Sequence, residues 1–500
     1  MNHQTPIKII HTEKGMPAQT ADTLQEGRRN MVQSMQGMQN SQVTIYVQAY
    51  NRLDKTKICI ESILMYTQDV DYTLLLVDNG SSDGTLEYFQ SIPYPKKQIL
   101  RITKNIGAAF PSLLLSAAEC SSYMVFLGND IIVTKNWLSN ILRGMEADET
   151  IGMVCPVSSN VSNLQQVNLS FQNYEELQQQ AAAYNQPDLS KWQERLRLIT
   201  PATVYRKECL LAVGLPIADI GFFHDFLDDD ITFRVRHAGY KAMLAGDTWV
   251  HHNHNVFSGE GKDPEQFQRS LEIGRMNFME KHHGIDAWED VNNFWMDATS
   301  ELPAPVHQGP MQVLGVDVRC GTPILDIKNY LRTQGIFQTE LSAFTEDAKY
   351  MPDLQTICDG IVCSDREEFF GGQYLGSSFD YIVIDKPLNR FHEPQFMLDQ
   401  AMRLLKPKGI LLLSLSNTFG VREFMYCRGS YDLYNPQFAY HIPLEALYKA
   451  CAAYGSILFT KSRPLSLDEE SKTYLRSLLP ADDLMPRLLT DTYILGVQKQ

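Results

Sequence analysis

The sequence predicts an α/β protein built from two consecutive Rossmann-like domains. Short apolar runs rich in β-branched residues alternate with helical segments twice along the chain, over residues 42–300 and again over 311–500. At 500 residues the chain is also too long for one ordinary core. Between the two stretches, Pro303, Pro305 and Pro310 mark a linker at 301–310. Strand–helix alternation of this kind predicts parallel sheets whose ligands bind at the carboxyl ends of the strands.

The composition is that of a soluble globular protein, with 44% hydrophobic and 21% charged residues. A formal net charge of −15 argues against nucleic acid or an anionic membrane as the main partner. The nine cysteines are odd in number and form no CxxC pair, which argues against a disulfide framework or a zinc knuckle. No apolar run reaches the roughly 18 residues of a transmembrane segment, and no signal peptide is evident. We therefore expect a cytoplasmic protein.

Residues 1–41 are rich in Gln, Met, Asn and Thr, with a weak helical pattern through Leu24, Met31 and Met35. We expect a mobile arm or one amphipathic helix. The alternative is an arm that docks on a partner subunit, so a homo-oligomer is a candidate assembly.

The first predicted domain opens with a strand at Val43–Val47, which ends at Ala49–Arg52 before a helix. A second strand, Tyr72–Val77, stops at Asp78 and a turn-rich run. An acidic residue at such a strand end can accept hydrogen bonds from a nucleotide base or ribose. The alternative is that Asp78 only caps the turn.

A third predicted strand, Tyr123–Leu127, ends in Gly128-Asn129-Asp130, and the run Asn105–Ala109 precedes an intervening helix. A carboxylate directly after a central strand can hold Mg²⁺ or Mn²⁺ that bridges a diphosphate. This position is the first candidate metal site.

Charged residues also gather in the stretch 222–253. Asp228, Asp229 and Asp230 stand at the start of a predicted helix, and His251 and His252 end a predicted strand about twenty residues later. Adjacent carboxylates repel one another unless a cation, an arginine or a proton-transfer role stabilises them. The helix N-terminus explains one or two of the aspartates but not the histidine pair.

Five strings in order carry a family resemblance: VTIYVQAYNR, LLLVDNGSSDGT, KNIGAA, FLGNDIIV, and FLDDDITFRVRHAGYK followed by WVHHN. Residues 43 to about 255 resemble a family 2 glycosyltransferase with the GT-A fold. The resemblance implies Asp228 as the catalytic base, with Asp230 in reserve, and Asp130 with His251 or His252 at a Mn²⁺ or Mg²⁺ site. It further implies a donor site lined by Ala49, Tyr50, Arg52, Asp78, Asn105, Gly107 and Asn129.

The sequence departs from the family at the metal motif DxD, because Gly128 and Asn129 occupy its first two positions. Only Asp130 brings a charge. We therefore expect weaker metal binding, or a larger contribution from the phosphates of the donor or from the histidines.

The second predicted domain, residues 311–500, resembles a class I S-adenosylmethionine-dependent methyltransferase through SFDYIVID and LDQAMRLLKPKGILLLSLSN. The first turn has Asp317, Arg319 and Pro323 where small residues would be expected. S-adenosylmethionine binding and a retained fold used for packing, dimerisation or acceptor presentation both stay open. Candidate cofactor contacts are Gly315, Gly321, Glu340 and Asp365.

The resemblance implies an inverting, metal-dependent glycosyltransferase. It would move a sugar from a nucleoside-diphosphate donor to a hydroxyl of a glycan, lipid-linked glycan or protein in bacterial surface-glycan synthesis. Two alternatives stay open: an S-adenosylmethionine-dependent methyltransferase acting on a sugar, and a non-catalytic glycan-assembly protein.

Overall fold

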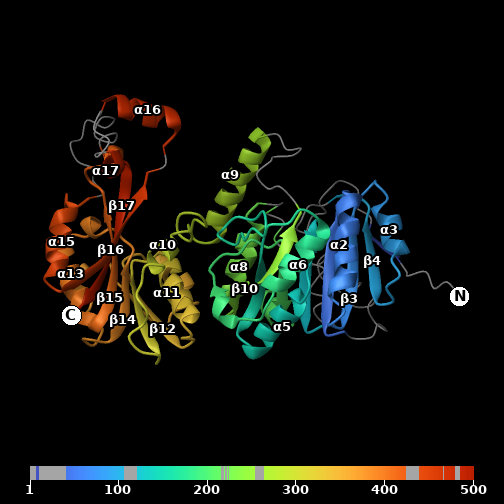
Figure 1. Ribbon diagram of the computed structural model, residues 1–500, viewed down its shortest axis with the longest axis horizontal. Helices are drawn as coiled ribbons and strands as arrows, with labels where there is room; N and C mark the ends of the chain where they lie inside the picture. The colour runs from blue at the N-terminus through green and yellow to red at the C-terminus, as the bar shows by residue number, and fades with distance from the viewer. Residues whose placement is uncertain are drawn as a thin grey trace. The chain divides into compact units, whose positions relative to one another are not determined.

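The computed structural model describes residues 7–10, 41–105, 121–214, 219, 222, 225–253, 264–423, 438–465, 467–478 and 485–500. The chain divides into two compact units, Met1–Asn292 and Asn293–Gln500, which are described separately (Figure 1). Both are α/β, as the sequence predicts. None of the helices described is long and apolar enough to cross a membrane.

The first unit is built on a mixed sheet. Its parallel part has the order β1-β4-β3-β2-β5, and an antiparallel strand then leads to β7, β10 and β6. The strands are β1 (Ile7–Ile10), β2 (Val43–Ala49), β3 (Tyr72–Asn79), β4 (Lys97–Ile102), β5 (Tyr123–Gly128), β6 (Ile131–Ile132), β7 (Ile151–Ser158), β8 (Gln193–Glu194), β9 (Ala202–Arg206) and β10 (Lys241–His252).

Helices cover both faces of this sheet, because the side chains of β2 alternate between two cores. Val43, Ile45 and Val47 belong to one buried cluster with α2, α3 and α5, and Tyr46 belongs to the other with α6, α7 and α8. The helices are α2 (Leu53–Tyr66), α3 (Thr85–Ser91), α5 (Trp137–Ala147), α6 (Tyr174–Tyr184), α7 (Lys207–Val213) and α8 (Leu227–His237).

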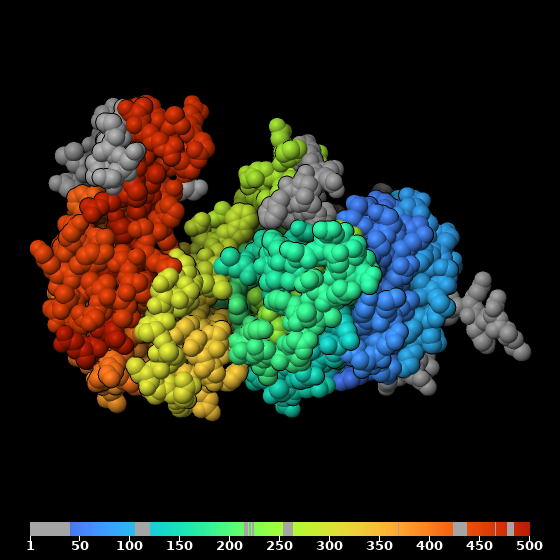
Figure 2. Space-filling model, in the orientation of Figure 1, coloured from blue at the N-terminus to red at the C-terminus, as the bar shows by residue number. Residues whose placement is uncertain are grey.

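Helix α9 (Pro264–Lys281) projects from the body of the first unit, in yellow-green in Figure 2. Gly274 and Phe278 are its buried residues, whereas Ile273 and Met276 are exposed. The helix is thus anchored near its C-terminal end.

The N-terminal arm differs from the expectation at one place. Ile7–Ile10 is neither mobile nor helical but forms β1, parallel to β4. Three β-branched isoleucines favour an extended backbone that can pair with the edge of the sheet. Residues 11–40 of the arm lie outside the described residues.

The second unit contains a sheet of order β13-β12-β11-β14-β15-β17-β16, parallel from β13 to β15, with β17 antiparallel to both its neighbours. Its strands are β11 (Met311–Val316), β12 (Thr339–Thr345), β13 (Gly360–Cys363), β14 (Phe379–Ile384), β15 (Leu405–Ser416), β16 (Gly455–Pro464) and β17 (Thr490–Lys499). Its helices are α10 (Met296–Thr299), α11 (Thr322–Thr333), α12 (Met351–Leu354), α13 (Pro394–Leu404), α15 (Leu444–Ala452), α16 (Glu469–Leu478) and α17 (Met485–Leu489).

The division between the units falls before the predicted domain end at residue 300. Trp295 is fully buried in the second unit, where its backbone N–H donates to Asp326 Oδ2 at 2.6 Å and its Nε1–H donates to Asp385 Oδ1 at 2.8 Å. These bonds attach the segment 293–300 to the second sheet.

Candidate active site

The strand order brings the predicted site residues of the first unit to one edge of the sheet. Strands β2, β3, β4 and β5 are parallel, so their carboxyl ends lie together. Strand β9 is antiparallel to both β5 and β7, and β10 is parallel to β7. Strand β10 therefore runs in the same direction as β5 and ends at the same edge. The end of β10 pairs with β6, His252 opposite Ile131, and this pairing places His252 beside Asp130.

The turn after β2 is held in a strained conformation. Asn51 and Arg52 both have left-handed backbones, with φ of 53° and 59°, which non-glycine residues rarely adopt. Asn129 Nδ2 donates to the Asn51 carbonyl at 3.1 Å and to Thr56 Oγ1 at 2.9 Å. Asn129 thus ties the turn to the end of β5. Tyr50, in the same turn, is 48% exposed.

Asp78, at the end of β3, is fully buried. Its Oδ1 accepts the Ser81 backbone N–H at 2.8 Å, and its Oδ2 forms an ion pair with Arg101. Asp78 therefore builds the turn after β3, which is the structural alternative that the sequence left open. Nearby, Asn105 Oδ1 accepts a hydrogen bond from Asn79 Nδ2 at 3.0 Å. Gly107 lies outside the described residues.

Gly128 makes room for the carboxylate of Asp130. A Cβ atom at position 128 would lie 2.9 Å from Asp130 Oδ1. The Gly128 N–H donates to the carbonyl of Pro201 at 3.3 Å, which fixes the turn against the residue before β9. The departure from DxD thus leaves space at the strand end into which the Asp130 carboxylate turns.

His252 faces Asp130, with 3.5 Å between Nε2 and Oδ2. Its Nδ1 lies 3.1 Å from the carbonyl oxygen of Asn160. A carbonyl can only accept, so Nδ1 donates to it, and Nε2 is the ring nitrogen that faces the carboxylate. An imidazole nitrogen oriented by a backbone carbonyl, next to a carboxylate, is a donor pair suited to a divalent cation.

His251 points elsewhere. Its Nδ1 is 2.7 Å from Ser159 Oγ, and its ring packs edge-on against Phe171. Burial, and then the neighbouring His252, lowers the pKa of His251 to about 4, so this imidazole is neutral at physiological pH. Of the two predicted histidines, His252 is the one beside Asp130. Within the described ranges, no group of three or more His, Cys, Asp or Glu side chains could hold a metal ion.

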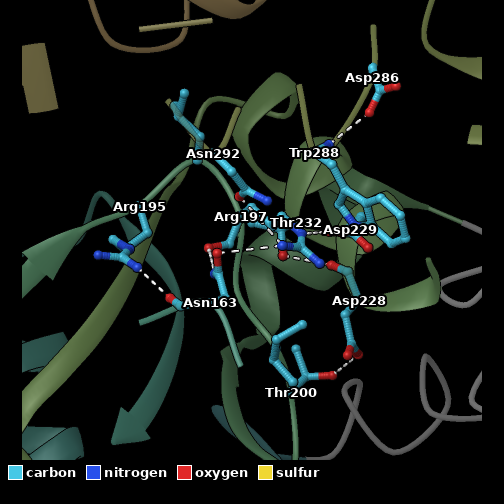
Figure 3. A network of polar contacts seen from close by, with 12 residues as sticks. Asn163, Arg195, Arg197, Thr200, Asp228, Asp229, Thr232, Asp286, Trp288 and Asn292 are labelled. Atoms are coloured by element: carbon cyan, nitrogen blue, oxygen red, sulfur yellow. Dashed lines mark hydrogen bonds and ion pairs between the residues drawn. The ribbon is translucent and has the colours of Figure 1, made fainter. Parts of the chain in front are cut away.

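The three adjacent aspartates of α8 have different surroundings, and Figure 3 shows those of Asp228 and Asp229. Asp228 is half-buried, and its Oδ1 accepts a hydrogen bond from the Thr200 hydroxyl. Burial raises the pKa of Asp228 to about 6, although the Thr200 hydrogen bond opposes the rise. A carboxylate with such a pKa is ionised at neutral pH and can still accept a proton.

Asp229 and Asp230 are buried and paired. Asp229 forms an ion pair with Arg197. Asp230 Oδ1 lies 2.7 Å from Lys281 Nζ and 2.9 Å from His282 Nε2. Burial raises the pKa of Asp230, but these two hydrogen bonds outweigh it and the net shift is downward. Asp230 thus joins α8 to the end of α9, which removes the reason for a second candidate base.

Sequence reasoning missed Thr200, Arg197 and Lys55. Thr200 and Arg197 lie in the irregular segment before β9, 28 and 32 residues from the aspartates they contact, and no motif marks them. Lys55 lies in the first turn of α2, and its Nζ donates to the carbonyl of Asn253, next to His252. The signal in the sequence is a lysine three residues after the turn at the end of a strand.

The candidate cofactor residues of the second unit do not form one site. A Cβ on Gly315 would lie 2.8 Å from both Val318 and Ile324 side-chain atoms, and one on Gly321 would lie 2.4 Å from Ile357 Cδ1. Glu340 stands at the amino-terminal end of β12, opposite to the ligand edge, where it accepts from Gln312 at 2.6 Å. Asp365 is exposed after the end of β13.

The chain's own side chains occupy the ligand edge of the second sheet. Asp385, just after β14, accepts Nδ2–H of Asn293 and Nε1–H of Trp295, each at 2.8 Å. Arg319, in a left-handed backbone with φ of 54°, reaches toward the same carboxylate, with Nε at 3.7 Å. Because Arg319 and Ile357 fill space that a glycine-rich turn would leave to a cofactor, the residues present do not fit S-adenosylmethionine.

Residues 44–208 match the family model described as glycosyl transferase family 2. No curated protein sequence matched the chain. Solved structures similar to the chain include a mannosyltransferase from Pyrobaculum calidifontis in complex with GDP-Man and Mn²⁺, at 17% identity and a TM-score of 0.33, covering 51% of this chain and 79% of that one. TarS of S. aureus is 13% identical with a TM-score of 0.34, covering 48% and 40%.

A structure similar to the chain is also found among methyltransferases. A SAM-dependent methyltransferase from Archaeoglobus fulgidus is 12% identical with a TM-score of 0.30, and the match covers 45% of this chain and 99% of that one. At such identities and TM-scores these structures carry no argument about activity. The family match thus identifies residues 44–208, within the first unit, as a glycosyl transferase family 2 domain, and the chain continues with a second α/β unit.

Proposed function

We propose that this protein is an inverting glycosyltransferase that moves a sugar from a nucleoside-diphosphate donor to an acceptor hydroxyl. The observation that carries the proposal is the placing of two unlike groups at one sheet edge. Asp130 and His252 form a candidate cation site, and Asp228 forms a candidate base. Thr200 contacts Asp228, and the next residue, Pro201, contacts the turn before Asp130.

The donor would lie over the ends of β2, β3 and β5. Tyr50 is exposed there, and Arg52 lies in the turn that Asn129 secures. Asp78 and Asn105 would border the base and ribose through the turns they build. The remaining candidates for this donor site are Ala49 and Gly107.

The residues present fit a divalent cation, Mn²⁺ or Mg²⁺, held by Asp130 and His252 with the phosphates of the donor completing its coordination. When bound, such a cation stabilises the negative charge of the departing nucleoside diphosphate. Lys55 adds a positive charge on the same side, and its bond to the Asn253 carbonyl keeps it there.

On the acceptor side, Asp228 would take the proton of the attacking hydroxyl. The hydroxyl oxygen forms a bond to the anomeric carbon while the bond from that carbon to the diphosphate breaks, which inverts the configuration. A hydroxyl is a poor nucleophile at neutral pH, so a positioned carboxylate is needed. The pKa of about 6 leaves Asp228 ionised and able to accept.

The acceptor is a hydroxyl of a glycan, a lipid-linked glycan or a protein, and we place the reaction in the cytoplasm, in bacterial surface-glycan synthesis. The second unit would serve packing, dimerisation or acceptor presentation, since its ligand edge does not fit S-adenosylmethionine.

A panel of sugar nucleotides tests the proposal by thermal stabilisation of the full chain, with Mn²⁺ and with a chelator. A donor at 100 times its Kd stabilises the folded state by about 2.7 kcal/mol. We expect one donor class to raise the Tm, more strongly with Mn²⁺. If no sugar nucleotide stabilises the protein or is hydrolysed by it, the proposed function is wrong.

A further inference from the structure

An irregular segment, residues 195–201, connects the two halves of the candidate active site. At its end, the Thr200 hydroxyl donates to Asp228 Oδ1, and the Pro201 carbonyl accepts the Gly128 N–H at 3.3 Å. Two consecutive residues thus contact the candidate base and the turn that carries Asp130. A displacement of this segment would move both.

The segment lacks regular secondary structure over most of its length, yet side chains fix it on one side. Gln165 Oε1 accepts the Ile199 N–H at 2.7 Å, and Gln165 Nε2 donates to the Ile199 carbonyl at 2.9 Å. Asn163 Nδ2 donates to the Arg197 carbonyl at 2.9 Å. These bonds replace the ladder that a strand would provide and hold the backbone on either side of residue 198.

Helix α8 fixes the other side. The buried Arg197 side chain forms an ion pair with the buried Asp229, next to the candidate base (Figure 3). Arg236, two turns further along α8, donates from Nε to the Leu196 carbonyl at 3.1 Å. A buried ion pair is a poor source of net stability but a strong constraint on geometry, because either partner alone would be an unpaired buried charge.

We propose that Thr200 is a positioning residue for the acceptor base, and that the Arg197–Asp229 ion pair holds Thr200 in place. This inference rests on the proposed function, in which Asp228 is the base. The Thr200 hydroxyl fixes the rotation of the Asp228 carboxylate and stabilises its ionised form, which is the form that accepts a proton.

Several charged or titratable groups face Asp228 from the surrounding elements. Asp229 adjoins it on α8 and Arg197 faces it from the irregular segment. Tyr205 on β9 and Cys155 on β7 interact electrostatically with Asp228, and burial raises the pKa of both so that both stay neutral. Because Arg197 and Asp229 neutralise one another, the Thr200 hydroxyl is the neighbour that distinguishes the two protonation states of Asp228 most directly.

The experiment compares Thr200→Val, Thr200→Ser and wild type by the pH dependence of kcat/KM for transfer. The valine removes a hydrogen bond that favours the ionised carboxylate, so the pKa of the base rises. The acidic limb of the profile of kcat/KM against pH should therefore move to higher pH by roughly one unit. The serine keeps the hydroxyl, so the acidic limb should stay at the pH of the wild type. Donor affinity, measured by calorimetry, should be unchanged in all three proteins.

Thr232→Val is the matched control. Thr232 is on the same helix and buried, but its hydroxyl donates to the backbone carbonyl of Asp228 at 2.7 Å and not to the carboxylate. The same change in chemistry should therefore leave the acidic limb unmoved. If Thr200→Val lowers transfer equally at every pH, or moves the limb no more than Thr232→Val does, Thr200 has no positioning role.

The proposed function has its own, separate readout. If the wild-type protein neither binds any sugar nucleotide nor transfers a sugar from one, the proposed function is wrong, and the inference about Thr200 fails with it. Should wild type transfer normally and Thr200→Val show an unshifted limb, only the present inference fails.

Discussion

The ligand edges of the two sheets use their polar side chains in opposite ways. In the first unit, one neighbour orients each key group: the Asn160 carbonyl sets His252, and the Thr200 hydroxyl sets Asp228. In the second unit, Asp385 accepts two N–H groups from Asn293 and Trp295. The first edge holds side chains in position, whereas the second uses its central carboxylate to bind the chain to itself.

The comparison shows that a doubly wound topology gathers strand ends at one edge of the sheet but does not by itself create a binding site there. Both sheets direct strand ends to one edge, and in both an aspartate follows a central strand. The two edges differ in the residues around that aspartate. In the first unit they orient it toward a site, and in the second they occupy its hydrogen-bonding capacity. Substitutions should therefore affect activity at the first edge and stability at the second.

The largest effect is expected for Asp228→Asn. Loss of the base should lower kcat for transfer by about 10²- to 10⁴-fold. Because the folded-state pKa of Asp228 is raised, its ionised form costs stability as the pH rises through about 6, so the amide should not lower the Tm at pH 8. Transfer assays and calorimetry measure both quantities. Transfer within tenfold of wild type would remove Asp228 from the mechanism.

The next effect is expected for Asp130→Ala and His252→Ala. Loss of groups that only surround a metal site costs roughly 10- to 100-fold in affinity, so loss of a ligand should weaken Mn²⁺-dependent donor binding by at least that much. His251→Ala is the control, because His251 faces Ser159 and should retain metal dependence. Calorimetry with Mn²⁺ and donor measures the change. Equal losses in the two histidine variants would contradict the assignment of His252.

A smaller effect, on stability alone, is expected for Asp385→Ala in the second unit. The change removes the Asp385 acceptor from two part-buried N–H groups, Nδ2–H of Asn293 and Nε1–H of Trp295. Each unsatisfied group costs about 1–3 kcal/mol, so the unfolding transition of this unit should move to lower urea concentration. Sugar transfer below the transition should equal that of wild type. Reduced transfer with unchanged stability would give the second edge a functional role.

The smallest effect is expected for S-adenosylmethionine itself. Since Arg319 and Ile357 fill the turn, a saturating concentration should leave the Tm of the full chain unchanged. Differential scanning calorimetry with and without the cofactor measures this. A clear increase in Tm would show that the second edge can bind a ligand, and would contradict the proposed difference between the two units.

The fold was largely predictable, because strand periodicity and turn residues mark the ends of β3 and β5 and so place Asp78 and Asp130. The choice between His251 and His252 was not predictable from the sequence, because it depends on the pairing of β10 with β6. Glu340 was matched to a ribose contact after the second strand, but it is the second residue of β12 and lies at the end of that strand away from the ligand edge. Thr200 is found only by tertiary contact.

Predicted turns could also be absorbed into strands. The run 406–409, Lys-Pro-Lys-Gly, is typical of a turn, but β15 begins at Leu405 and continues through it. The pairing jumps from Phe379 opposite Leu405 to Tyr381 opposite Ile410, so the extra residues form an irregularity within the strand. A proline and a glycine signal a local break, but they do not decide whether the strand resumes in register.

The absence of a side chain at Gly128 has a kinetic consequence. A site with a single carboxylate attracts a free divalent cation weakly, whereas a cation already bound to a diphosphate arrives with most of its ligands. Donor and metal would then bind in one step, as a preformed complex. We expect initial rates to follow the concentration of that complex, and donor in excess over metal to inhibit, because metal-free nucleotide competes for the same edge.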